Sequence, residues 1–206
     1  MKKVSSIFLA AAAALGFSGC KSTPTAIVVV DELYDFIDGS LACKRSEECV
    51  KNSEVLLKEA AAKGTPIFFV CDYHPADHSS FVEQGGPWPP HCVQGTRGGE
   101  IADELKPFVK EENVFLKGTK QAEEQYSGFE GVSKAGVSLN DALKALGIKK
   151  VTVIGIATEY CVRNTAEDLL KAGYEVSIPE NALACVDEDG HVEAVAAMKA
   201  EGIDIY

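Results

Sequence analysis

The sequence is short of positive charge, of long apolar runs and of cysteine. It carries 20 lysine and arginine residues against 31 aspartate and glutamate residues, a formal net charge of -11 at pH 7. Such an acidic chain repels phosphate backbones, which argues against nucleic acid as a partner. The apolar run from Val4 to Phe17 is shorter than the ~20 residues that a membrane-spanning helix needs. The 7 cysteines in 206 residues are too sparse for a small scaffold built on disulfides.

The bulk composition is that of a globular protein. Hydrophobic residues make up 46% of the chain and charged residues 25%. These values exclude global disorder, collagen-like repeats and a membrane protein with several spans. The length suits one compact domain with a terminal appendage, and we expect the domain to cover residues 26–206.

Residues 1–19 are typical of an export signal. Two lysines follow Met1, an apolar segment comes next, and the small residues Ser18 and Gly19 precede Cys20. This ending resembles the bacterial lipobox, although Phe17 stands where leucine is usual. We therefore predict an exported lipoprotein that is anchored to a bacterial membrane by lipid on Cys20 and faces the periplasm or the cell exterior. Residues 20–25 would form the lipidated N-terminus and a short linker. The alternatives are an ordinary cleaved signal and the first helix of a cytoplasmic protein.

The rest of the chain alternates apolar strand-like runs with helical periodicity. The runs have little polar alternation, as expected for strands buried on both faces. Four helical segments end at a glycine and are followed at once by a strand, at Gly64, Gly147, Gly173 and Gly202. The pattern predicts an α/β fold, a three-layer sandwich with a central, mainly parallel, six-stranded Rossmann-like sheet. The six predicted strands are 26–30, 66–71, 113–116, 150–154, 174–178 and 203–205.

Reactive side chains stand where such a sheet places its ligand site. Asp31, Asp72 and Lys117 each end a predicted strand, and Cys161 opens the helix after another. Each alone is more often a turn, cap or packing residue, but together they suggest a cysteine nucleophile with an aspartate base and an orienting lysine. We expect the helix start to lower the pKa of the thiol. The backbone N–H groups of Ala157 and Cys161 are candidates for an oxyanion hole.

A second group of residues has the chemistry of a metal site. Asp72 and His74 project to the same side of an extended segment, and His91 closes the long loop that follows. Two histidines and one aspartate with open positions can hold a catalytic divalent ion, and zinc, iron and manganese all accept this donor set. His78 lies in the same loop.

Taken together, these motifs give the chain a family resemblance. It resembles nicotinamidases of the isochorismatase-like cysteine hydrolase superfamily, for example in DELYDF from Asp31, DYHPADH from Asp72 and EYCVRNTAEDLL from Glu159. The matching segments follow the family order over nearly all of residues 26–206 and leave the signal segment outside. They are 26–42, 72–81, 86–96, 114–118, 126–131 and 155–170.

The resemblance implies a role for each motif residue. The implied catalytic triad is Asp31, Lys117 and Cys161. The implied metal ligands are Asp72, His74 and His91, with His78 or waters completing the shell. A cis peptide bond between Ile156 and Ala157 is implied to turn the Ala157 N–H towards the oxyanion. The implied aromatic walls around the pyridine ring are Phe36, Trp88 and Tyr126.

The implied reaction is hydrolysis of nicotinamide to nicotinate and ammonia, with pyrazinamide also accepted and one divalent metal, zinc foremost, as cofactor. Metal-free relatives such as isochorismatases and carbamoyl amidohydrolases are the nearest alternatives, and they do not need the histidine set. A metal- or ligand-binding lipoprotein without turnover is a second alternative. A homo-oligomer is compatible with the sequence. Cys43 and Cys49 could pair in an oxidising compartment, whereas Cys71, Cys92 and Cys185 are expected to be buried thiols.

Overall fold

The computed structural model describes residues 23–206. The predicted signal peptide 1–19 and the predicted lipidation site Cys20 lie outside the described residues. No helix in the described part of the chain is both long enough and apolar enough to span a bilayer.

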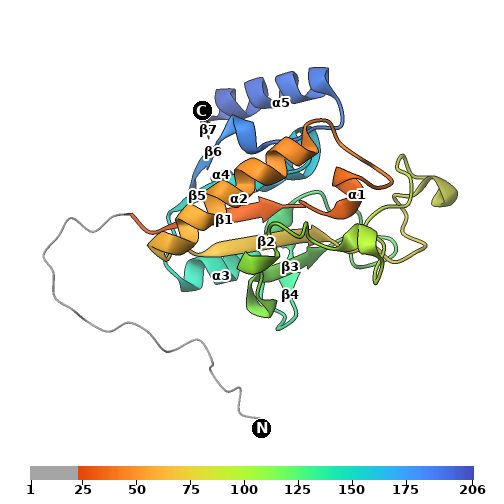
Figure 1. The fold of residues 1–206 in the computed structure, drawn as a ribbon, viewed down its shortest axis with the longest axis horizontal. Helices are drawn as coiled ribbons and strands as arrows, with labels where there is room; N and C mark the ends of the chain where they lie inside the picture. The colour runs from red at the N-terminus through yellow and green to blue at the C-terminus, as the bar shows by residue number, and fades with distance from the viewer. Residues whose placement is uncertain (1–22) are drawn as a thin grey trace, which may run out of the picture.

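One sheet of seven strands forms the centre of the molecule, in the order β4-β3-β2-β1-β5-β6-β7 (Figure 1). All neighbouring strands are parallel except β3 and β4. The strands are β1 Thr25–Val30, β2 Ile67–Asp72, β3 Val114–Lys117, β4 Val132–Ser133, β5 Lys150–Gly155, β6 Glu175–Ile178 and β7 Asp204–Ile205.

The predicted α/β class and mainly parallel sheet are confirmed, but the predicted number of six strands is one short. The additional strand, β4, has only two residues and pairs antiparallel to β3 at the edge of the sheet. So short a strand has no apolar run of its own, and it exists only because the end of β3 lies beside it.

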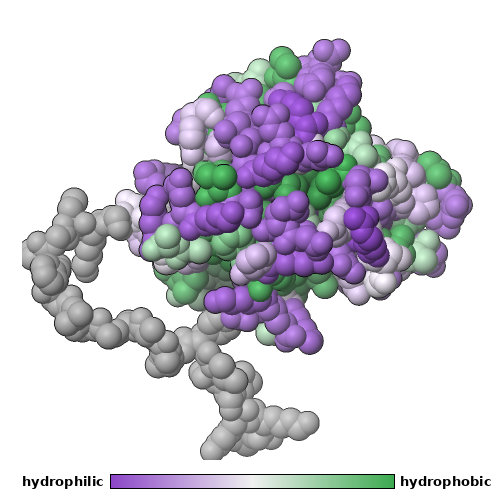
Figure 2. Space-filling view, viewed as in Figure 1, coloured by the Kyte–Doolittle hydropathy of each residue, from purple (hydrophilic) through white to green (hydrophobic). Residues whose placement is uncertain are grey.

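Helices cover both faces of the sheet and make it a three-layer structure (Figure 1). The helices are α1 Tyr34–Ile37, α2 Ser46–Lys63, α3 Leu139–Ala145, α4 Arg163–Lys171 and α5 Glu188–Glu201. Alternate residues of β1 serve the two cores. Val28 and Val30 pack with α3 and α4, while Ile27 and Val29 pack with α1 and α2. The outward faces of α2 and α5 carry mostly hydrophilic residues (Figure 2).

The order of the strands determines where a ligand can bind. β1 lies in the middle of the sheet, with β2 on one side and β5 on the other. In such sheets the chain leaves the central strand towards opposite sides, which opens a crevice at the carboxyl ends of the strands. The ends of β1, β2, β3 and β5 all lead to this edge, where the predicted site residues lie.

The six described cysteines are free, buried thiols. The pairing of Cys43 with Cys49, which the spacing left open, is not formed. The Cys49 sulfur lies 3.2 Å from the carbonyl oxygen of Ala182, and the Cys43 sulfur lies 3.4 Å from that of Leu41.

A buried carboxyl group, that of Glu32, lies two residues after the end of β1. The side chain of Glu32 accepts a hydrogen bond of 2.6 Å from Ser53 on α2. Its second oxygen, Oε2, has no partner among residues 23–206. Burial raises the pKa of Glu32 to about 8, so the group is a neutral acid at pH 7.

The raised pKa of Glu32 predicts a pH-dependent loss of stability. In the unfolded chain Glu32 ionises near its usual pKa of 4.5, whereas in the folded protein it keeps its proton up to about pH 8. The folded state therefore binds more protons over this range, and the free energy of unfolding falls as the pH rises through it. Glu32→Gln should remove about 2–4 kcal/mol of this decline between pH 5 and pH 8, as measured by urea unfolding at a series of pH values.

The matched control is Glu47→Gln on the exposed face of α2, where the side chain is 80% accessible. This variant should follow the wild-type pH dependence. If the stability difference between Glu32→Gln and wild type were the same at every pH, Glu32 would not be the titrating group.

Candidate active site

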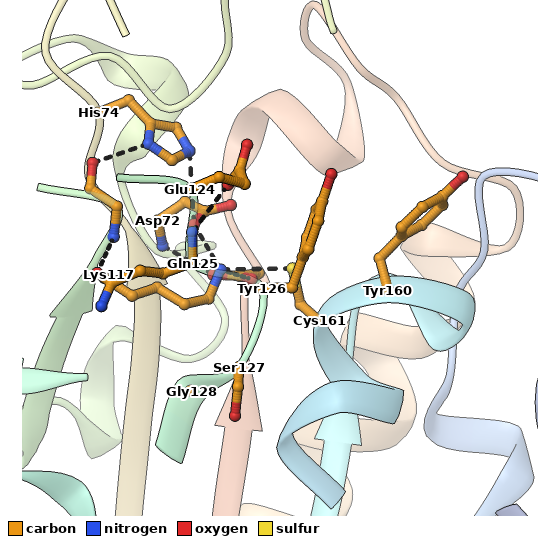
Figure 3. Close-up of polar contacts among 12 residues, drawn as sticks. Asp72, His74, Lys117, Glu124, Gln125, Tyr126, Ser127, Gly128, Tyr160 and Cys161 are labelled. Carbon is orange, nitrogen blue, oxygen red and sulfur yellow. Dashed lines mark hydrogen bonds and ion pairs between the residues drawn. The ribbon is translucent and has the colours of Figure 1, made fainter. Parts of the chain in front are cut away.

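The carboxyl ends of three neighbouring strands bring two acids and a lysine together. Asp31 follows β1, while Asp72 and Lys117 are the last residues of β2 and β3 and stand opposite each other in the sheet register. The Lys117 ammonium pairs with Asp31 at 2.9 Å and also with Asp72. All three side chains are buried. Lys117 therefore bridges the predicted triad and the predicted metal ligands (Figure 3).

The cysteine reaches the same point from β5. After Gly155 the chain passes into a π-helical turn, η6 Thr158–Val162, which continues as α4. The sulfur of Cys161, in this turn, lies 3.3 Å from the Lys117 nitrogen. It also lies within 4.8 Å of a carboxylate oxygen of Asp31. The structure thus brings the three residues of the predicted triad together.

Burial controls the proton affinities of these groups. Burial and the nearby charge of Asp72 raise the pKa of Asp31 to about 6, although the charge of Lys117 lowers it. Burial also raises the pKa of the Cys161 thiol well above its usual value, although the Lys117 charge acts in the opposite direction. The expectation that the helix start lowers this thiol pKa is therefore wrong for the free site, because desolvation and the charges of Asp31 and Asp72 outweigh the opposing charge of Lys117. Cys161 needs a proton acceptor, and Asp31 is ionised above about pH 6.

The turn between β5 and η6 has the features expected of an oxyanion-binding segment. The Ile156–Ala157 peptide bond is cis, as the resemblance implies. Ala157 lines the pocket beside Cys161. Its N–H donates to no backbone carbonyl of residues 23–206. It is thus available to a ligand at this position.

The predicted metal ligands form a compact, buried set. Asp72, His74 and His91 each offer one donor atom, and these atoms lie within 4.8 Å of one another. The Nδ1 atom of His74 is 2.9 Å from the carbonyl oxygen of Gly118, and that of His91 is 2.8 Å from the carbonyl oxygen of Pro89. Because a carbonyl can only accept, both rings carry hydrogen on Nδ1 and leave Nε2 for a metal. Two imidazoles and one carboxylate suit a divalent transition metal.

His78 does not join this set. Its Nδ1 lies 2.7 Å from the Ser80 hydroxyl, and its Nε2 lies 3.1 Å from the carbonyl oxygen of Glu123. Both ring nitrogens are therefore occupied by protein groups. The ring instead lies against His74, tilted by 31° and with 4.1 Å between the centroids. Of the two candidates for completing the metal shell, this arrangement favours water over His78.

A pocket opens in front of these groups. It contains the three predicted aromatic residues Phe36, Trp88 and Tyr126. It also contains residues that the sequence did not single out, namely Leu41, Glu124, Tyr160 and Val186. Tyr160 could have been found by its position directly before Cys161, whereas the other three are brought in by the fold.

The aromatic side chains of the pocket hold one another in place. The Trp88 indole donates a 3.0 Å hydrogen bond to the Tyr126 hydroxyl. The Tyr160 ring lies edge-on to Trp88 at 5.0 Å and tilted to Tyr126 at 5.7 Å between centroids. On the side of the predicted metal ligands, the Phe36 ring lies against the His91 ring with 5.4 Å between the centroids. The result is a slot with apolar walls that suits a flat aromatic ring.

Comparisons with known proteins agree with this geometry. The sequence model of the isochorismatase domain matches residues 25–205. The nicotinamidase/pyrazinamidase of Mycobacterium tuberculosis is 35% identical over 184 residues, covering 87% of this chain and 97% of that protein.

Two solved structures have a similar fold. The pyrazinamidase of Pyrococcus horikoshii in complex with zinc has a TM-score of 0.80 and 36% identity, covering 89% of this chain and 98% of that one. The PnC1 protein of L. infantum in complex with nicotinate has a TM-score of 0.78 and 32% identity, covering 89% of this chain and 92% of that one.

Proposed function

The chain belongs to the isochorismatase family, and on that premise we propose that it is a nicotinamidase, which hydrolyses the amide bond of nicotinamide. The observation that carries this function is the Cys161 sulfur beside Lys117 and Asp31 at the base of an aromatic slot. A nucleophile, a base and a flat binding site are the elements that hydrolysis of an aromatic amide requires.

Asp31 and Lys117 activate the nucleophile. The buried Cys161 thiol keeps its proton in the free site, so Asp31 accepts that proton as the substrate carbonyl arrives. Lys117, at 3.3 Å from the sulfur and 2.9 Å from Asp31, stabilises whichever of the two carries the negative charge. The proton can therefore move without leaving a buried charge unpaired.

The Cys161 thiolate attacks the carboxamide carbon, and the electron pair of the C=O bond moves to oxygen. The N–H groups of Ala157 and Cys161 hold this oxyanion. When the tetrahedral state collapses, the C–N bond breaks and Asp31 returns the proton to the leaving ammonia. Water then cleaves the thioester, with Asp31 as base, and releases nicotinate and the free thiol.

Asp72, His74 and His91 would hold the divalent metal, and we propose zinc, with iron and manganese as alternatives. When bound, the ion supplies a Lewis-acid contact for the pyridine nitrogen and so fixes the ring in the slot. Phe36, Trp88 and Tyr126 line the pocket and would contact the ring. Pyrazinamide keeps both the ring nitrogen and the amide, so we expect it to be a substrate too.

The test is ammonia release from nicotinamide, pyrazinamide and a carbamoyl compound, and pyruvate release from isochorismate, each measured with the metal-loaded protein. We expect turnover of the first two substrates alone. Turnover of isochorismate or the carbamoyl compound in their place would assign the chain to another activity of the family. Saturable binding of nicotinamide with no ammonia release would make it a binding protein.

We propose further that the protein is exported and held at a bacterial membrane by lipid on Cys20. The support is the sequence pattern of residues 1–20. We expect the full-length chain to pellet with membranes and the Cys20→Ala chain to stay in the soluble fraction, because two or three acyl chains give stable anchoring. Ser22→Ala, two residues further on, should still pellet. A wild-type protein found in the soluble fraction with residues 1–20 still attached would contradict the proposal.

A further inference from the structure

Thr158, the residue after Ala157, anchors the turn between β5 and η6 to a neighbouring segment of the chain. Thr158 is fully buried, and its N–H and its hydroxyl both donate to the carbonyl oxygen of Ala184, at 2.9 and 3.0 Å. Ala184 in turn donates its N–H to the carbonyl oxygen of Gly155 at 3.2 Å. The position of the Ala157 N–H therefore depends on how Thr158 is held.

A histidine on another helix completes this arrangement. His191 lies near the start of α5, which packs against η6, and its side chain is 4% exposed. Its Nδ1 atom is 3.0 Å from the Thr158 hydroxyl oxygen. Because the hydrogen of that hydroxyl points to Ala184, Nδ1 of His191 must be the donor. Its other nitrogen, Nε2, is 3.8 Å from the Glu180 carboxylate, which is too far for a hydrogen bond. The neutral ring can therefore keep its hydrogen on Nδ1, and the charged ring carries hydrogen on both nitrogens.

His191 has no part in the reaction described above. It is the one histidine of the chain's four that lies outside residues 74–91, and it does not line the pocket. A buried, hydrogen-bonded imidazole at this place acts on the reaction only through Thr158.

We propose that His191 is a positioning residue of the oxyanion hole: by donating to Thr158 it holds the Ala157 N–H in the direction that the tetrahedral oxyanion requires. This inference rests on the proposed function. Loss of this hydrogen bond should affect only some ligands. A displaced Ala157 N–H weakens binding of the charged tetrahedral state but leaves binding of the flat substrate and product unchanged.

Two substitutions separate the hydrogen bond from the bulk of the side chain. The amide nitrogen of His191→Asn takes nearly the place of Nδ1 and can still donate to Thr158. In His191→Gln the amide reaches the place of Nε2 and leaves the Thr158 oxygen without its donor. We expect His191→Asn to keep most of the rate and His191→Gln to lose about tenfold in kcat with KM unchanged, a fraction of the 10²–10³-fold cost of removing an oxyanion donor.

The decisive readout compares two ligands. With pyridine-3-carbaldehyde, the Cys161 sulfur adds to the aldehyde carbon, the C=O pair moves to oxygen and the thiol proton passes to Asp31, so the adduct carries the oxyanion. Nicotinate fills the same slot without forming a bond. His191→Gln should weaken binding of the aldehyde about tenfold and binding of nicotinate less than twofold. Thr158→Val should show the same selectivity, and the double variant should lose little more than either single one.

The control is Val192→Ala, at the next residue of α5, which is 64% exposed. It should match wild type in every readout. Equal loss of aldehyde and nicotinate binding in His191→Gln, or a His191→Asn protein as slow as His191→Gln, would overturn the inference. Failure of this inference can be distinguished from failure of the proposed function. A wild-type protein that releases no ammonia from nicotinamide would refute the proposed function, whatever the His191 variants do.

Discussion

The Cys161→Ala protein is expected to release no measurable ammonia from nicotinamide, a loss of at least about 10⁴-fold in kcat. The methyl group of alanine fits the place of the thiol and leaves the acids, the lysine and the metal ligands in position. Fold and metal content should therefore be unchanged, as checked by circular dichroism and metal analysis. Cys161→Ser should be nearly as inactive, because a hydroxyl has a far higher pKa than a thiol and Asp31 is too weak a base to ionise it.

Substitution of the other two triad residues should also abolish ammonia release. Asp31→Asn removes the proton acceptor, and Lys117→Ala leaves two buried carboxylates without their cation, so each loss should approach that of Cys161→Ala instead of adding to it. Cys43→Ala is the matched control, since Cys43 is also a buried thiol but lies outside the pocket. Because Cys161 is the one cysteine that lines the active-site pocket among residues 23–206, alkylation should label it before the other described thiols, and nicotinamide should protect it. Wild-type turnover by Cys161→Ala would end the cysteine-hydrolase account.

Loss of one metal ligand is expected to have the next largest effect. His91→Ala should lose its bound metal and fall at least about 10²-fold in kcat/KM. Among residues 23–206 the structure offers three protein ligands at this site, and His78, the nearest further histidine, is already bonded to Ser80 and Glu123. Metal content by mass spectrometry and ammonia release together measure the effect. Asp72→Ala and His74→Ala should behave alike.

A companion variant tests the placement of His78. His78→Gln should keep one metal ion per chain, because neither of its ring nitrogens faces the ligand set. Loss of metal in His78→Gln would show that His78 completes the shell. Stoichiometric metal in the His91→Ala protein would remove His91 from the site.

The sequence was most informative where function depends on strand ends. Asp31, Asp72 and Lys117 could be placed together because each directly follows or ends a buried apolar run, and parallel strands bring their carboxyl ends to one edge. His91 could be predicted as a metal ligand only because it lies in a long loop that is rich in histidine. The structure adds that Lys117 pairs with both carboxylates, which sequence order alone does not contain.

The features of the site that could not be predicted from the sequence depend on packing between distant segments. The pKa of Cys161 is raised by burial among groups from four strands, and helix position alone predicted the opposite direction. Val186 enters the pocket from a loop that carries no motif. The contact between His191 and Thr158 joins residues 33 positions apart on two helical segments and has no local signal.

The central claim is that nicotinamide is hydrolysed through a thioester on Cys161, and partition of the acyl group with hydroxylamine tests it most directly. Metal-loaded protein is given nicotinamide with rising hydroxylamine, and ammonia, nicotinate and nicotinohydroxamate are measured together, with Cys161→Ala as the blank. A thioester intermediate predicts that hydroxamate rises at the expense of nicotinate while both acyl products together equal the ammonia released. Ammonia released with nicotinate as the only acyl product at every hydroxylamine concentration, or hydroxamate formed equally by Cys161→Ala, would contradict it.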